Sequence, residues 1–349
     1  MGGAVRITIK DVAMRAGVSV ATASRALNNG GRMQQETRDR VQQAAADLSY
    51  RPNSMARGLV QKRSFTLGLL TNDTYGRFTL PVAAGLSGAL VSRGVSVLLA
   101  SYQDDPALAQ TNLDALEDKR VDGLVIAGKR IDRGLPAGLS RPDIPTIHVM
   151  SECGPDGIGF VPDDTGGGRL ATQHLSDLGR RRIAHITGPL TFTAARLREQ
   201  GWRGALADND LPLWTGAIFG DWSEAHGYAA AGHLFGPDRS APPPDAIFCG
   251  NDQIARGVID RLTLLGVRVP DDVAIVGFDN WELFAAATRP ALTTIDMGLV
   301  ELGRVAGLTL LDMIEGKPVA GGTTLNPTRL VVRQSCGADQ GGDAGGAGA

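Results

Sequence analysis

The spacing of hydrophobic and polar positions predicts two short helices near the start of the 349-residue chain. In TIKDVAMRAGVSVATASRALN (residues 8–28), apolar residues recur at helical intervals on either side of Gly17. Thr8, with Asp11 three positions later, suits the start of the first helix, and Ser19 suits the start of the second. Glycine readily adopts the left-handed conformation that ends a helix. The pattern therefore predicts a helix, a tight turn and a second helix, which is a helix-turn-helix.

A third helical pattern, in ETRDRVQQAAADLSY (residues 36–50), would close a small apolar core against the first two helices. Pro52 then interrupts the chain, and a short segment with Gly58 near its end follows. A helix of about eight residues that contains a glycine is too weak to form alone in water. We expect this segment to order only when DNA and a second copy of the chain hold it.

From residue 64 onward, short apolar runs alternate with helical patterns. Such alternation predicts parallel sheets with helices on both faces. The alternation continues for too long to form one small sheet, so we expect two lobes. The predicted strands are TLGLL, VSVLLA, DGLVIAG, PTIHVM, RRIAHITG, GAIFG, DAIFCGND and DVAIVGFD.

The charge changes sign between the two parts of the chain. Residues 1–63 hold eleven Lys and Arg against four Asp and Glu, a balance of +7. The whole chain has a formal charge of -2, so the remaining residues carry -9. A small basic head on an acidic body is typical of a nucleic-acid-binding protein with a separate second domain.

The outer face of the second predicted helix is the candidate for reading DNA in the major groove. Arg25 can hold a guanine edge through two hydrogen bonds, whereas valine and alanine side chains can only contact thymine methyl groups. The candidate base-reading residues are Val20, Ala21, Arg25 and Asn28. Short hydroxyls suit phosphate contacts, which position a protein without reading sequence. The candidates for this role are Thr8, Ser19, Thr22 and Ser24.

The segments IKDVAMRAGVSVATASRALN and TRDRVQQAAADLSYRPNSMARGL resemble the LacI/GalR family of bacterial transcriptional regulators. The resemblance continues nearly to residue 335, through RVDGLVIAG, TQHLSDLGRRRIAHITGP, PDAIFCGNDQIARGV, VPDDVAIVGFDN and PALTTID. It implies a small all-α helix-turn-helix head and an α/β periplasmic-binding-protein-like body of two doubly wound lobes. The chain would cross between the lobes near residues 163, 291 and 325.

These features predict four successive parts. They are a helix-turn-helix DNA-binding domain (1–51), a hinge helix and linker (52–63), a two-lobed effector-binding domain (64–336) and a disordered tail (337–349). Within the body, we expect lobe 1 to comprise about 64–163 and 292–325, and lobe 2 about 164–291 and 326–336. The glycine-rich tail has no leucine heptads, so we expect a homodimer rather than a tetramer.

The resemblance also implies how the hinge would meet DNA. In the family, the hinge helices of two chains pair in the minor groove, and a leucine corresponding to Leu59 wedges between base pairs and kinks the operator. On this basis, Ala56, Arg57 and Leu59 are minor-groove candidates, and the operator is expected to be double-stranded and near-palindromic.

Ligands of open parallel sheets bind at the carboxyl ends of the strands. Asn251 and Asp279 stand at such ends, and Arg198 follows a strand and a Gly-Pro turn. An amide, a carboxylate and a guanidinium can bridge the hydroxyls of a sugar, while aromatic rings can cover its apolar side. The candidate effector-binding residues are Phe78, Glu152, Phe160, Arg198, Trp222, Asn251 and Asp279. The resemblance supports Arg198, Asn251 and Asp279, which match the effector positions of the family.

Other kinds of site are not expected. Three cysteines lie far apart, and five histidines show no metal-ligand spacing, so we expect no metal, cofactor or disulfide framework. GLVIAGKR (123–130) lacks the Ser or Thr of a phosphate-binding loop and is interpreted as a strand with its exit turn. TGGGRLA (165–171) is interpreted as a flexible hinge between the lobes. No motif requires catalysis, and we expect no enzyme.

The chain has neither an apolar stretch of membrane-spanning length nor a signal peptide at its start, so we expect a cytoplasmic protein that does not contact membranes. The favoured function is a homodimeric repressor controlled by a small molecule, most simply a sugar. The alternatives are a sugar-binding transport receptor, which would share the body, a regulator that senses a non-sugar such as a purine, and an enzyme built on the same lobes.

Overall fold

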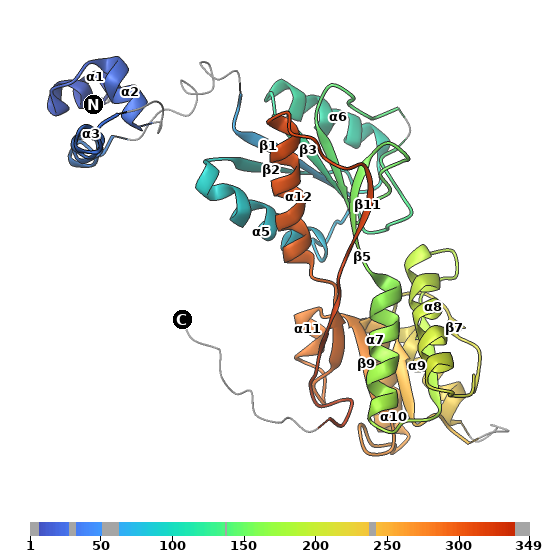
Figure 1. Ribbon diagram of the computed structural model, residues 1–349. Helices are drawn as coiled ribbons and strands as arrows, with labels where there is room; N and C mark the ends of the chain where they lie inside the picture. Colours follow the sequence, from blue (N-terminus) through green and yellow to red (C-terminus); the bar gives the residue numbers. More distant parts are fainter. Residues whose placement is uncertain (1–6, 28–32, 51–62, 137, 237–241, 339–349) are drawn as a thin grey trace, which may run out of the picture. The chain divides into compact units, whose positions relative to one another are not determined.

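The computed structural model describes residues 7–27, 33–50, 63–136, 138–236 and 242–338 (Figure 1). Its contacts divide the chain into two units, one ending at Phe65 and one beginning at Thr66. Asn28, the three hinge candidates at 56, 57 and 59, and tail residues 339–349 lie outside the described residues. Their predicted roles therefore stay predictions.

The described residues of the first unit form three helices, which we call the head. A capping box between Thr8 and Asp11 begins the first helix, and Gly17 follows it with φ +65°, the left-handed conformation that lets the chain turn at once into the second helix. This confirms the predicted helix-turn-helix. The helices are α1 (Ile9–Ala16), α2 (Val20–Leu27) and α3 (Gln35–Asp47). Their shared core consists of Val12, Ala13, Ala16, Ala23, Ala26, Val41, Ala44 and Ala45.

The second unit contains two six-stranded sheets, so the predicted two-lobed α/β body is confirmed. The first sheet is fully parallel, with the order β11-β5-β4-β3-β1-β2. Its strands are β1 (Thr66–Thr71), β2 (Ser96–Ser101), β3 (Gly123–Ala127), β4 (Thr146–Val149), β5 (Ile158–Pro162) and β11 (Gly322–Asn326). The helices and the 3-10 turn of this lobe are α5 (Thr79–Leu90), η1 (Val91–Arg93), α6 (Pro106–Asp118) and α12 (Leu299–Ile314).

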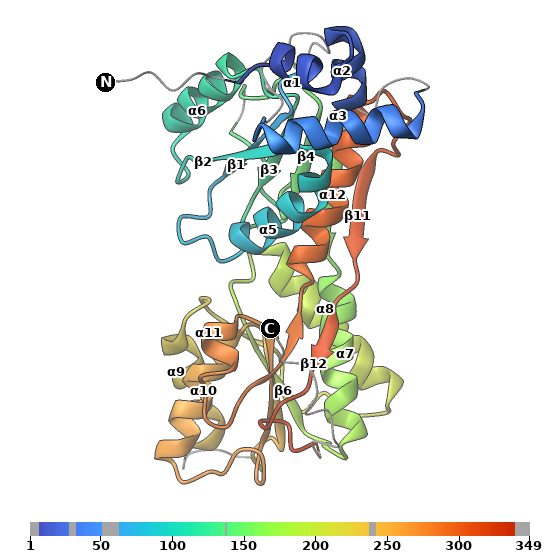
Figure 2. The ribbon, with the colours of Figure 1, turned by 90° about the vertical axis from the view of Figure 1, so that its left-hand side faces the viewer.

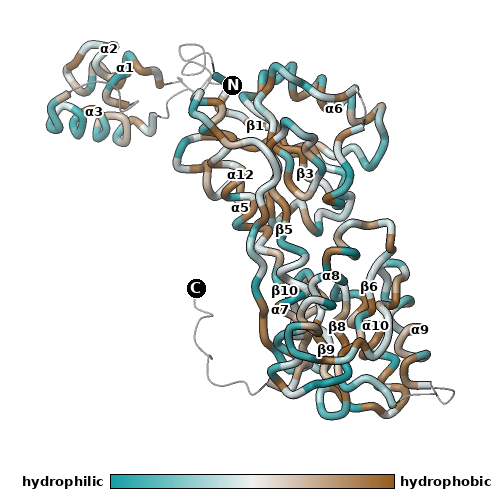
Figure 3. The backbone as a smooth tube through the Cα atoms, turned by 45° about the vertical axis from the view of Figure 1, so that its right-hand side comes forward, coloured by the Kyte–Doolittle hydropathy of each residue, from teal (hydrophilic) through white to brown (hydrophobic). Residues whose placement is uncertain are grey.

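The second sheet has the order β12-β10-β9-β8-β6-β7 and is parallel except for the pairing of β10 with β12. Its strands are β6 (Ile183–Thr187), β7 (Ile218–Phe219), β8 (Ala246–Cys249), β9 (Ala274–Asp279), β10 (Thr293–Asp296) and β12 (Arg329–Val331). Its helices are α7 (Asp164–Asp177), α8 (Thr193–Asp208), α9 (Glu224–Phe235), α10 (Asp252–Leu264) and α11 (Glu282–Ala285). Every residue of the central strands β6, β8 and β9 is buried, and hydrophobic stretches follow these strands in Figure 3.

The chain crosses between the two sheets three times, after β5, after β10 and after β11 (Figures 1 and 2). The first and third crossings lie where the sequence predicted them. The second does not, because β10 pairs with β9 in the second sheet. Residues 293–296 thus belong to lobe 2, and the crossing follows Asp296 rather than residue 291. The sequence of a short strand at a crossing does not show which sheet the strand joins. Its hydrogen-bonded neighbour, here β9, decides this.

The glycines of TGGGRLA are not a hinge but part of α7. A side chain at Gly168 would collide with the backbone carbonyl of Arg198, and one at Gly201 would collide with the carbonyl of Thr165. Glycine therefore allows α7 and α8 to approach closely at the point where both reach the space between the lobes. The interpretation of these glycines as a flexible hinge was wrong, because close packing accounts for them.

Gly168→Ala should lower the free energy of unfolding by about 1–3 kcal/mol, since the added methyl group has no space between α7 and α8. Gly88→Ala is the matched control: Gly88 is exposed on α5, and a Cβ there meets no atom within 4 Å. This control should be neutral or up to about 1 kcal/mol more stable, because alanine favours helix. Urea unfolding of both variants tests the comparison, and equal effects would contradict the close-packing role.

Candidate functional site

The outer face of α2 carries the described base-reading candidates. Val20, Ala21 and Arg25 are exposed, and the Nε of Arg25 donates a hydrogen bond to the carbonyl oxygen of Ala21 at 3.3 Å. Ser19 caps the helix by accepting a hydrogen bond from the backbone N–H of Thr22 at 3.1 Å. The face is thus a short, rigid helical surface with one exposed guanidinium, as a groove-reading helix requires.

The four residues whose hydroxyls are predicted to contact phosphate lie near the start of a helix or on α2. Thr8 precedes α1, Ser19 precedes α2, and Thr22 and Ser24 lie on α2. Thr8 donates from both its backbone N–H and its hydroxyl to Asp11, each at 2.8 Å. The hydroxyls of Ser19 and Thr22 lie 2.8 Å apart. Helix N-termini favour anions, so these positions remain suitable for phosphate contacts, which stay a prediction.

A cavity of about 300 Å³ lies between the two lobes of the body, at the carboxyl ends of their strands. Both lobes contribute walls, and the walls mix aromatic, apolar and charged side chains. The lining residues are Arg77, Phe78, Lys129, Arg130, Ile131, Asp132, Met150, Asp164, Phe192, Ala194, Arg198, Trp222, Asn251 and Asp279. Five of the seven predicted effector residues are therefore brought together: Phe78, Arg198, Trp222, Asn251 and Asp279.

Arg198 is the buried cation at the base of the cavity, with 5% of its surface exposed. Its Nε donates to the carboxylate of Asp164 at 2.7 Å and its Nη1 to the carbonyl oxygen of Gly250 at 2.5 Å. The same Nη1 lies 3.6 Å from the Asp279 carboxylate, and the guanidinium carbon lies 3.6 Å from the centre of the Phe278 ring. Burial raises the pKa of Asp164 against the lowering influence of Arg198. Arg198 and Asp164 therefore form a buried ion pair, and the loss of either residue would leave the other as an unpaired buried charge.

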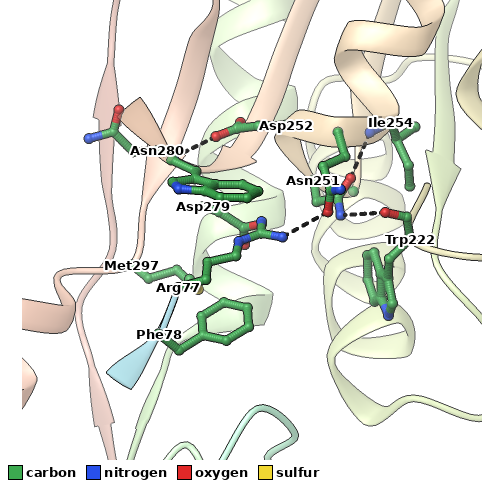
Figure 4. A network of polar contacts seen from close by, with 12 residues as sticks. Arg77, Phe78, Trp222, Asn251, Asp252, Ile254, Asp279, Asn280 and Met297 are labelled. Atoms are coloured by element: carbon green, nitrogen blue, oxygen red, sulfur yellow. Dashed lines mark hydrogen bonds and ion pairs between the residues drawn. The ribbon is translucent and has the colours of Figure 1, made fainter. Parts of the chain in front are cut away.

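Asp279 ends β9 in a strained conformation, with φ +105°. Non-glycine residues rarely adopt such an angle, and it costs on the order of 1–3 kcal/mol. Its carboxylate accepts from Arg77, which reaches across from the first lobe (Figure 4). Burial lowers the pKa of Arg77 to about 10, so the guanidinium is still charged at neutral pH. Its Nε is buried and lacks a hydrogen-bond partner among the described residues, a donor that water or a ligand hydroxyl would satisfy.

Asn251 and Asp252 begin α10 and have different tasks. The Asn251 side-chain oxygen accepts from the backbone N–H of Ile254 at 2.7 Å, and its amide donates to the carbonyl of Trp222 at 3.3 Å (Figure 4). Asp252 is completely buried and accepts from Thr294 and from the backbone of Trp281. Burial raises the pKa of Asp252 to about 6, because those hydrogen bonds offset only part of the desolvation. Asn251 thus borders the cavity, while Asp252 joins β10 to α11.

The aromatic walls come from both lobes. Trp222 is half-buried, contacts the edge of Phe192 with ring centres 5.9 Å apart, and lies against Gly188, where any side chain would collide with its ring. Phe78 stands on the first-lobe side, next to Arg77. Flat rings on two sides of a space lined by hydrogen-bonding groups suit a ligand with apolar faces and a polar rim.

A second link between the lobes closes the edge of the cavity. Asp132, after β3, accepts from the backbone N–H of Thr193 at the start of α8 at 2.9 Å. Arg130 hydrogen-bonds Asp132 and lies with its guanidinium carbon 3.6 Å from the centre of the Phe192 ring. Burial would raise the pKa of Asp132, but the hydrogen bonds from Arg130 and Thr193 outweigh it and lower the pKa to about 2. The carboxylate is therefore ionised at any physiological pH.

Two predicted effector residues are not brought to the cavity. Phe160 lines a neighbouring groove, and Glu152 lines a separate hollow in the first lobe. The expectation that they join the other candidates was wrong. Phe160 lies inside β5 rather than after it, and Glu152, three residues past the end of β4, donates its backbone N–H to the carbonyl oxygen of Arg133 in the loop after β3. Conversely, the sequence prediction missed the first-lobe residues Arg77, Arg130 and Asp132. Their signal was available, since they follow β1 and β3, whose carboxyl ends the same rule would have selected.

Other kinds of site are not found in the part of the chain that the structure describes. Within it, no group of three or more His, Cys, Asp or Glu side chains is placed to hold a metal ion. No helix in the described ranges combines the length and apolar composition that a membrane crossing requires.

Comparison with family models gives two matches. Residues 8–53 match the model of bacterial regulatory proteins of the lacI family, and residues 172–336 match a periplasmic binding protein-like domain. Among characterised proteins, the ribose operon repressor of Escherichia coli (strain K12) is 36% identical over 305 residues, 86% of this chain and 90% of that protein. The HTH-type transcriptional repressor CytR of the same strain is 32% identical over 343 residues, 94% of this chain and 96% of that protein.

Two solved structures are similar to this chain over nearly its whole length. A lac repressor dimer bound to operator and the anti-inducer ONPF aligns with a TM-score of 0.71 and 29% identity, covering 95% of this chain and 99% of that one. A complex of the transcriptional regulator CelR with cellobiose aligns with a TM-score of 0.65 and 30% identity, covering 95% of this chain and 100% of that one.

Asp164→Ala should lower the free energy of unfolding by about 3–5 kcal/mol, because it leaves the buried Arg198 without its nearest carboxylate. The double variant with Arg198→Ala should lose clearly less than the sum of the two single changes. The control cycle uses Glu199 and Arg203, an exposed pair on the same helix, whose coupling should stay below about 1 kcal/mol. Urea unfolding measures both cycles, and additive losses for Asp164 and Arg198 would contradict their mutual dependence.

Proposed function

The chain belongs to the lacI family of bacterial regulatory proteins, and from this membership we infer that it is a homodimeric transcriptional repressor whose operator binding is controlled by a sugar in the cavity between its lobes. The repressor acts in the cytoplasm on double-stranded, near-palindromic DNA. The observation that carries the effector half is the convergence of Arg198, Asn251 and Asp279 on one cavity with two aromatic walls.

The DNA-binding half rests on the head. Its exposed α2 face, its helix-turn-helix geometry and the +7 balance of residues 1–63 all suit major-groove binding. The relatives support the same role, since a lac repressor dimer was solved bound to its operator. A transport receptor would share the body but has no use for such a head.

The sugar half rests on the chemistry of the cavity. Its guanidinium, amide and carboxylate groups suit ligand hydroxyls, and Trp222 and Phe78 can cover the apolar side of a ring. The names of relatives point the same way, since one is the repressor of a ribose operon and another was solved with cellobiose. A purine would use the aromatic walls, but it offers fewer hydrogen-bond donors to the carboxylates of the cavity than the hydroxyls of a sugar do.

Control of DNA binding follows from linkage between the two sites. The lobes are joined across the cavity by Arg77 with Asp279 and by Asp132 with Thr193. A ligand that binds the two lobe arrangements with different affinity shifts their populations. If DNA also prefers one arrangement, the ligand changes DNA affinity by the same factor by which DNA changes ligand affinity.

Purified full-length protein should be stabilised by one or more sugars in a thermal-shift panel of monosaccharides, disaccharides, sugar phosphates and purines. A sugar at about 100 times its Kd adds about 2.7 kcal/mol of stability. Arg198→Lys should abolish this response and leave operator affinity unchanged, because lysine keeps the charge but loses the planar fork. Stabilisation by purines alone would refute the sugar assignment, and an equal loss of operator affinity would refute the role of Arg198.

Arg25→Ala should weaken binding to a DNA site selected from random sequence by the wild-type protein, by about 1–3 kcal/mol, while non-specific binding changes little. Arg15→Ala is the matched control, an exposed arginine on α1 that pairs with Asp47 and should affect both DNAs alike. Fluorescence anisotropy at fixed salt measures the affinities. An equal loss on both DNAs for Arg25→Ala would remove it from the base-reading set.

A further inference from the structure

The effector cavity has a larger neighbour, and three side chains line both spaces. The neighbour is a groove of about 1110 Å³ between α5, α11, α12 and the ends of β10 and β11. Arg77, Phe78 and Asp279 line both the groove and the 300 Å³ cavity. The partition therefore consists of one first-lobe arginine, its neighbouring ring and the second-lobe carboxylate that the arginine contacts.

Arg77 is held in this partition from several directions. Its guanidinium pairs with Asp279, and its Nη1 donates to the side-chain oxygen of Gln253 at 2.9 Å. The guanidinium carbon lies 5.0 Å from the ring centre of Phe78 and 4.6 Å from that of Trp281. Only 13% of the side chain is exposed. A long side chain fixed at its far end by a carboxylate, an amide and two rings is a rigid wall rather than a mobile surface group.

We propose that Arg77 is a specificity-determining residue of the effector site, where it closes the cavity against the groove and restricts the effector to a single sugar ring. The proposal rests on the sugar-sensing function proposed above and adds to it the size class of the ligand. A second ring that extends from a bound sugar toward the groove would have to enter the space that the Arg77–Asp279 pair fills.

The fold by itself does not impose this restriction. The transcriptional regulator CelR aligns over 95% of this chain and was solved with cellobiose, a disaccharide. A size limit in this protein must therefore come from particular side chains that narrow the space. Arg77 is such a side chain, because its removal would join a 300 Å³ cavity to a groove several times larger.

The two properties of Arg77, its bulk and its charge, can be separated by substitution. Arg77→Ala removes both, whereas Arg77→Met keeps an unbranched side chain that fills most of the length of the arginine stem and removes the charge. Asp279 stays compensated in either variant, since Arg198 Nη1 lies 3.6 Å from it, so the folded state should tolerate the change. Arg77→Ser is a second small replacement that repeats the test with a polar side chain.

The experiment is isothermal titration calorimetry of wild type and these three variants with ribose, glucose and galactose and with cellobiose, lactose and maltose. Wild type should bind at least one monosaccharide and bind the disaccharides at least 100-fold more weakly. Arg77→Ala and Arg77→Ser should bind a disaccharide at least tenfold more tightly than wild type does. Arg77→Met should admit a disaccharide less readily than Arg77→Ala does, because its side chain still occupies much of the partition.

The possible failures differ in meaning. If wild type binds none of the six sugars, the proposed sugar-sensing function fails. If wild type binds a monosaccharide but the small variants exclude disaccharides as strongly as wild type does, sugar sensing stands and the role of Arg77 is refuted. Tight disaccharide binding by wild type, or admission of disaccharides by Arg77→Met as readily as by Arg77→Ala, refutes it as well.

Discussion

A guanidinium removed from water needs acceptors on several sides, and this requirement at Arg198 organises the second lobe around the cavity. Its partners are Asp164 at the start of α7, the carbonyl of Gly250 after β8, and Asp279 at the end of β9. They come from three separate stretches of sequence. One buried cation thus sets where a helix starts and where two strands end. The glycines that let α7 approach α8 serve the same arrangement, because Gly168 packs directly on the Arg198 backbone.

The same charges extend to the first lobe. Asp279 is shared by Arg198 from its own lobe and Arg77 from the other, so a change at either guanidinium alters the electrostatic surroundings of the other. These two partners hold the strained backbone of Asp279 in place. Backbone strain of this kind is usually found at binding sites. Asp279, which we propose as an effector contact, also holds the contact between the lobes, and this is a simple physical basis for coupling ligand binding to lobe arrangement.

Sequence patterns were sufficient for the framework of the fold. The helix-turn-helix followed from the spacing around Gly17, and all eight quoted apolar runs contain strands. The strands β5, β10, β11 and β12 were not among those runs, because three of them lie at crossings between the lobes and are short or partly polar. The position of the second crossing was misplaced for the same reason, since pairing across the sheet and not composition assigned β10.

The sequence predicted those residues of the site whose position follows from strand ends alone. It did not predict which side chains near strand ends point into the cavity. Arg198, Asn251 and Asp279 were found because parallel strands present their carboxyl ends on one edge. Glu152 and Phe160 also stand near strand ends, yet they face other hollows, and no local pattern reveals this. Arg77 follows β1, so the strand-end rule includes it, but no local pattern shows that it contacts Asp279, about two hundred residues away in sequence.

The three crossings between the sheets also set an order in which the parts of a newly made chain can become complete. The third helix of the head and the turn after it are complete by residue 50, but the first sheet lacks its edge strand until residue 326 has been added. At about 5–20 residues per second, that addition takes roughly 14–55 s of synthesis. During this interval every growing chain already contains the three described helices of its head but an incomplete first sheet, so the head can fold before the cavity between the lobes exists.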